Sequence, residues 1–108
     1  MDIKQLLQYV IDVKASDLHL VAGIPPTLRI EGELSPIATM GVLTPDVITE
    51  LFKPILSSEQ LERLTVNKEI DFSLAFSDKA RFRINAYTQR GSLAGAFRRI
   101  PTTIPAID

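Results

Sequence analysis

Residues 81–101 read RFRINAYTQRGSLAGAFRRIP. Apolar and polar side chains alternate from Phe82 to Ala86, and Leu93 and Phe97 are the apolar members of the run that follows. Such alternation is typical of strands with one buried face. Arg90-Gly91 suits a two-residue turn between them, because glycine tolerates the positive φ that hairpin turns require. The stretch predicts an antiparallel hairpin.

The same two-residue period occurs elsewhere in the chain. Residues 70–76 alternate between large apolar side chains and polar or small ones, which predicts a strand directly before the hairpin. Residues 17–20, 27–31 and 34–38 predict three shorter strands, separated by turn residues rich in glycine and proline. Because each strand has one apolar face, we expect an antiparallel sheet that helices cover on one side.

Three segments carry helix signals. Asp2 suits an N-cap ahead of apolar residues that recur at helical spacing from Ile3 to Val13. Residues 44–46, Thr-Pro-Asp, start a second helix that Pro54 ends or distorts. Residues 57–60 fit a capping box for a third helix. The order of helix, three strands, two helices and three strands predicts a two-layer α+β domain.

Composition narrows the class of protein. A chain of 108 residues with 45% hydrophobic residues has the size and core content of one globular domain. The absence of cysteine excludes disulfides and thiolate metal sites. A formal net charge of −1 argues against a nucleic-acid partner, which favours a basic surface. No run of residues approaches the roughly 20 apolar residues of a membrane span.

Two arginines of the hairpin pose an electrostatic problem. With the turn at Arg90-Gly91, Arg83 lies directly opposite Arg98, and facing like charges are destabilising. A loop at residues 78–80 would place Ala75 opposite Arg83, so in this register no carboxylate neutralises the pair. Either both side chains splay into water, or a bound anion bridges them, since guanidinium groups suit phosphate.

Asp17 and His19, the only histidine, share one face of a predicted strand. A metal site would need further ligands, and no second histidine supplies them. Acid–base chemistry at His19 is a second interpretation. The favoured interpretation is that the pair caps a neighbouring loop or helix. Two further features also have two interpretations. Residues 23–26 suit a turn or a partner-docking site, and Phe72 with Phe76 suits a core or a ligand cavity.

Two strings in the chain resemble a known family. Residues 15–20 fit A-S-D-[LI]-H-[LIF], and residues 83–85 fit R-[IV]-[NS], with Arg98 fifteen residues after the first arginine. Together they resemble the N-terminal domain of the type IV pilus retraction ATPases, the PilT-like branch of the secretion ATPase superfamily. The resemblance covers essentially the whole chain and implies a PAS-like fold. Arg99-Ile100 follows Arg98, as in the retraction branch. The extension and secretion branches commonly have two leucines at these two positions.

The resemblance implies roles for named residues. Arg83 and Arg98 would contact the γ-phosphate of ATP held by a RecA-like catalytic domain, with Arg81 and Arg99 as secondary candidates. It implies a structural or interface role for three residues, Asp17, His19 and Arg29. It implies no catalytic residue and no metal ligand in this chain.

The resemblance also implies an assembly. Six full-length subunits would bind ATP and Mg²⁺ and form a ring in which this domain packs on the RecA-like domains of its own and a neighbouring subunit. The ring would work in the cytoplasm, at the inner face of the bacterial inner membrane, on a platform protein of the pilus. We expect residues 1–101 to form the domain and residues 102–108 to begin a linker to an absent catalytic domain.

The chain contains no G-x-x-x-x-G-K-[ST] phosphate loop, so on its own we expect no hydrolysis and only weak nucleotide binding. Two alternatives stay open. One is an independent PAS-like sensory or interaction module, and the other is the same domain from a pilus extension or type II secretion ATPase.

Overall fold

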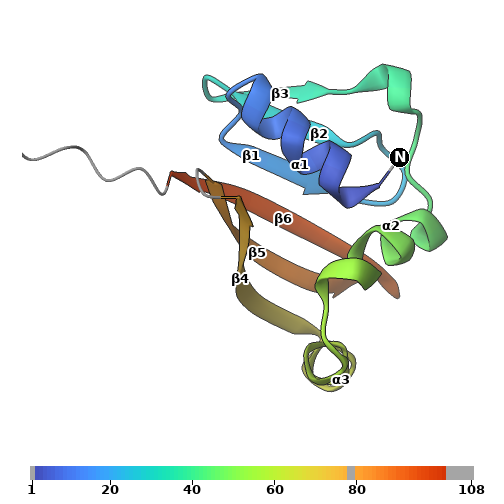
Figure 1. Ribbon diagram of the computed structural model, residues 1–108. Helices are drawn as coiled ribbons and strands as arrows, with labels where there is room; N and C mark the ends of the chain where they lie inside the picture. The colour runs from blue at the N-terminus through green and yellow to red at the C-terminus, as the bar shows by residue number, and fades with distance from the viewer. Residues whose placement is uncertain (1, 78–79, 102–108) are drawn as a thin grey trace, which may run out of the picture.

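The computed structural model describes residues 2–77 and 80–101, and Figure 1 shows helices packed on a β-sheet. The described strands form one six-stranded sheet in the order β3-β2-β1-β6-β5-β4, and all neighbours are antiparallel. This confirms the two-layer α+β prediction. The elements are α1 (Ile3–Asp12), β1 (Asp17–Leu20), β2 (Thr27–Ile30), β3 (Glu33–Pro36), η1 (Ala38–Met40), α2 (Pro45–Phe52), η2 (Lys53–Ile55), α3 (Ser58–Asn67), β4 (Glu69–Ser77), β5 (Ala80–Gln89) and β6 (Ser92–Pro101).

Local capping fixes where the helices begin. The Asp2 carboxylate accepts from the backbone N–H of Gln5 at 2.8 Å, and the Gln5 side chain accepts from the Asp2 backbone in return. Ser57 and Gln60 form the same reciprocal box at α3. These contacts satisfy backbone donors that the first helical turn leaves unpaired. All three predicted helix starts are confirmed.

The core lies between the helices and one face of the sheet, which we call the covered face. Helix α1 packs against β1, α2 against β6, and α3 against β4. Phe52 of α2 stacks on Phe97 of β6 with 5.4 Å between ring centroids, and both side chains are fully buried. Phe72 and Phe76 are half-buried and pack against this core, which is their predicted core role.

The last hairpin has the predicted register. Arg90 and Gly91 form the turn with φ values of 52° and 78°, and positive φ at both positions is the signature of a type I′ turn. Arg83 and Arg98 are therefore cross-strand partners on one face of the sheet.

The preceding hairpin differs from the prediction. Ser73, and not Ala75, lies opposite Arg83, while Ala75 lies opposite Arg81. The register shifts between Ala75 and Ser77, as at a β-bulge, and simple alternation does not signal such an irregularity. Strand β3 spans Glu33–Pro36, so it begins and ends earlier than the expected strand at residues 34–38. The expected linker at 102–108 lies outside the described residues.

Candidate functional site

Charged residues line up across the face of the sheet opposite the core. We call it the open face, and it carries Asp17, His19, Arg83, Asn85 and Arg98. Cross-strand pairing sets these side chains in one row: Arg29 of β2, Asp17 of β1, Arg98 of β6, Arg83 of β5 and Ser73 of β4. The row therefore crosses five strands, and the pairing of β1 with β6 brings the two early strands beside the three late ones.

Asp17 is the carboxylate that the sequence argument did not find. Its Oδ1 lies 3.6 Å from Nε of Arg98, and its Oδ2 lies 3.4 Å from Nε of Arg29. The Asp17 side chain is only 14% exposed. The expectation that no carboxylate lies near the arginine pair is wrong, because β1 pairs with β6 and places Asp17 directly opposite Arg98. The expected proximity of Asp17 and Arg29 is confirmed.

Arg83 and Arg98 share a hollow but differ in their partners. The hollow has a volume of about 280 Å³, and its lining includes both arginines with Asp17, His19, Asp71 and Asn85. Within residues 2–77 and 80–101, Arg83 makes no ion pair or side-chain hydrogen bond, whereas Arg98 faces Asp17 and keeps 76% of its side chain exposed. Two guanidinium groups with free N–H donors can bind an anion here.

Asp71, the second carboxylate in the lining of the hollow, has a separate partner. Asn85 donates to Asp71 Oδ1 at 3.0 Å and to Glu69 Oε1 at 3.1 Å. Sequence reasoning did not single out Asp71 or Asn85, although their alternation placed them on the same face as Arg83. Because Asn85 satisfies Asp71, this carboxylate does not need an arginine.

His19 lies in the same hollow with a partly unsatisfied ring. Its Nε2 is buried and has no hydrogen-bond partner among the described residues. In that part of the chain no cluster of three or more His, Cys, Asp or Glu side chains could hold a metal ion. The structural or interface role of His19 stays a prediction.

The two secondary arginines lie in different environments. Arg81 is the cross-strand partner of Ile100 and, two residues before Arg83, lies on the open face. Arg99 is the partner of Phe82 on the covered side, and its Nε donates to the carbonyl of Ala15 at 2.9 Å. Arg99 is thus directed away from the hollow that Arg83 and Arg98 share.

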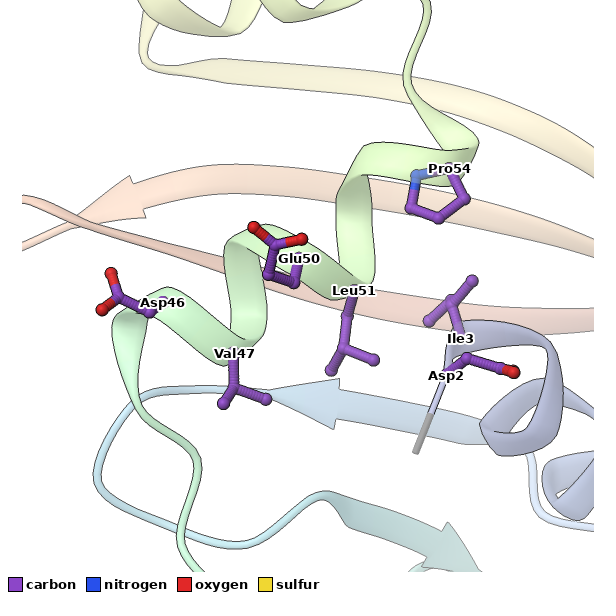
Figure 2. Close-up of a pocket in the computed structure, with 7 residues that line it drawn as sticks. All are labelled: Asp2, Ile3, Asp46, Val47, Glu50, Leu51 and Pro54. Carbon is purple, nitrogen blue, oxygen red and sulfur yellow. The ribbon is translucent and has the colours of Figure 1, made fainter.

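A second hollow, of about 290 Å³, lies between the start of α1 and helix α2 (Figure 2). Buried Ile3 and Leu51 provide apolar surface, and three acidic residues, Asp2, Asp46 and Glu50, lie around it. Three like negative charges oppose a phosphate group. Of the two hollows, only the one on the open face suits an anion.

Comparison with known proteins extends these observations. No family model matches the chain. It is 36% identical over 104 residues to the type IV pilus retraction ATPase PilT of Pseudomonas aeruginosa and 30% identical over 108 residues to the type IV pilus ATPase PilU of the same organism. These matches cover 96% and 100% of the chain. A crystal structure of the pilus retraction motor PilT with bound ADP superposes with a TM-score of 0.88 at 36% identity, over 97% of this chain and 31% of that one.

This chain is homologous to the N-terminal domain of the PilT-like ATPases. It spans only 30% of the length of PilT and 28% of PilU. The ATPase DotB of Legionella pneumophila superposes with a TM-score of 0.77 at 25% identity, over 97% of this chain and 31% of DotB. None of the helices in the described part of the chain has the length and apolar character needed to cross a bilayer.

Proposed function

We propose that this chain is the N-terminal domain of a hexameric pilus retraction ATPase of the cytoplasm and that it supplies two arginines to ATP. In this proposal Arg83 and Arg98 contact the γ-phosphate of a nucleotide that the RecA-like domain of a neighbouring subunit holds. The domain moves relative to that catalytic domain during the ATPase cycle, and the motion acts on the pilus at the inner membrane.

One observation carries the proposal: Arg83 and Arg98 are cross-strand partners on an open sheet face, and Arg83 has no counter-ion among the described residues. Facing like charges destabilise a sheet. A domain that keeps them exposed is suited to meet an anion from outside, and the family similarity makes a nucleotide phosphate the best candidate.

The residues fit a phosphate better than a metal ion. The guanidinium groups offer planar donors to phosphate oxygens, whereas no described carboxylate cluster suits Mg²⁺. The Mg²⁺–ATP held by the catalytic domain supplies the phosphoryl group that is transferred. Arg83 and Arg98 would stabilise the charge that develops on that group, as arginines supplied by a neighbouring molecule do elsewhere.

A second candidate is the equivalent domain of an ATPase outside pilus retraction. The similarity to DotB supports it, although the identity of 25% to DotB is lower than the 36% to PilT. Arg99-Ile100 after Arg98 favours the retraction branch. The arginine chemistry is the same in both candidates.

A subunit-mixing experiment tests the proposal. Full-length subunits with both Arg83→Ala and Arg98→Ala are combined with subunits that lack the phosphate-loop lysine of the catalytic domain. Each parent should be inactive, because each lacks one half of every site. Mixed rings should recover part of the ATP turnover, since some interfaces then unite an intact arginine pair with an intact phosphate loop.

Mass spectrometry of the intact rings provides the control that both subunit types are present together. Absence of recovered turnover in demonstrably mixed rings would remove the contribution across subunits. Turnover at the wild-type level in the arginine double variant alone would remove both arginines from the mechanism.

A further inference from the structure

We infer that Asp17 competes with the incoming anion for Arg98, so that the open face binds phosphate reversibly and releases it readily. The inference rests on the proposed phosphate role of Arg83 and Arg98. It assigns to Asp17 a regulating role beyond the structural one that the sequence predicts.

The geometry around Asp17 divides its two oxygens between two different arginines. Arg29 is anchored at its far end, where Nη1 donates to the carbonyl of Gly32 at 2.9 Å. Arg98 has no such anchor among the described residues, and its only recorded side-chain partner is Asp17, at 3.6 Å through Nε. An anion can therefore draw Arg98 away from Asp17 while Arg29 still neutralises the half-buried carboxylate.

The charges along the row also favour exchange over permanent pairing. From β2 to β5 the row runs Arg29, Asp17, Arg98 and Arg83, so one carboxylate stands among three cations. A contact at 3.6 Å is longer than an ordinary hydrogen bond, and the Arg98 side chain is 76% exposed to water. Such a pair is weak. It lowers the repulsion between Arg98 and Arg83 in the empty site and yields to a multiply charged phosphate.

The affinity for a polyanion should rise when Asp17 is replaced by asparagine. Asp17→Asn keeps the size of the side chain, removes the competing charge and leaves Arg98 available. We expect the affinity for a polyanion to rise several-fold, on the order of fivefold at low ionic strength, and the gain to shrink as salt screens the charges. In a full-length ATPase the same variant should retain product longer.

Pyrophosphate is the probe, and the chain itself is titrated with it by NMR at low salt. The matched control is Asp71→Asn, because Asp71 lines the same hollow but accepts from Asn85 and, within residues 2–77 and 80–101, makes no ion pair with an arginine. If Asp17 acts through Arg98, Asp17→Asn strengthens binding more than Asp71→Asn does. The gain should also vanish when Asp17→Asn is made in an Arg98→Gln background.

The outcomes separate the inference from the proposed function. If Arg83→Gln and Arg98→Gln weaken pyrophosphate binding but Asp17→Asn does not strengthen it, the Asp17 inference is overturned and the phosphate site stands. If neither arginine variant changes binding, the phosphate site fails, and the inference with it. If Asp17→Asn does not fold, the Nε–H resonances of the unaltered chain test the inference instead. On saturation with pyrophosphate the resonance of Arg98 must shift and that of Arg29 must not. The absence of a shift at Arg98 overturns the inference.

Discussion

Consecutive residues of β6 lie on opposite faces of the sheet, and the covered and open faces differ in how far their side chains are buried. Phe97 is fully buried against Phe52, while the next residue, Arg98, keeps 76% of its side chain in water. On the covered face the side chains are buried, and the free energy of unfolding depends on how closely they pack. The open face holds charges that cost stability or add little to it. Charged residues on the open face that do not stabilise the fold are therefore candidates for a function.

The largest effect on stability should come from the covered face. Phe97→Ala removes a fully buried ring and should lower the free energy of unfolding by about 3–5 kcal/mol. Arg98→Ala, one residue further on, should change it by less than about 1 kcal/mol, since exposed ion pairs contribute little. Urea denaturation of both variants checks the contrast. Equal losses in the two variants would show that the two faces do not differ as described.

Gly95→Ala should give the next largest loss. A methyl group at Gly95 would overlap the buried ring of Phe52 on the covered face, and overpacking a core costs about 1–3 kcal/mol. Ala96→Ser, one position along on the open face, serves as the control and should cost much less. Thermal unfolding followed by circular dichroism measures both. A Gly95→Ala domain as stable as the wild type would show that α2 packs less tightly on β6 than the structure indicates.

Arg99→Ala should lower the free energy of unfolding by a smaller amount, and its comparison with Arg81→Ala separates a bonded arginine from an exposed one. The Nε of Arg99 donates to the carbonyl of Ala15, and loss of such a hydrogen bond costs about 0.5–1.5 kcal/mol. Arg81→Ala removes an exposed arginine with no recorded side-chain partner among the described residues and should cost less. Denaturation midpoints of the two variants decide. Identical midpoints would show that the Arg99 contact contributes nothing.

Sequence patterns predicted most of the fold because its signals are local. Asp2, Thr44 and Ser57 cap the helices within a few residues of themselves, and Gly91 sits where the hairpin needs positive φ. The register of β5 and β6 followed from that turn. The register of β4 did not, because the irregularity near Ala75 has no local signal.

The site could be predicted only in part. The facing arginines followed from the hairpin, but the Asp17 carboxylate beside Arg98 came from the pairing of β1 with β6. That pairing joins the first and the last strand, and alternation alone does not reveal which strands become neighbours. The position of Arg99 on the covered side did follow the two-residue period, since it lies two residues after Phe97. Family resemblance, and not the period, had made Arg99 a phosphate candidate.

Arg83→Ala in the full-length protein tests whether the open face serves nucleotide chemistry and not stability. ATP turnover and the free energy of unfolding are measured on the same preparation of assembled rings. The free energy of unfolding should stay within about 0.5 kcal/mol of the wild type, because removing one of two facing cations leaves no cavity. Turnover should fall strongly, by up to about 10³–10⁵ if Arg83 acts as arginines do in well-studied phosphoryl transfer. Unchanged turnover, or turnover lost only together with the fold, would contradict it.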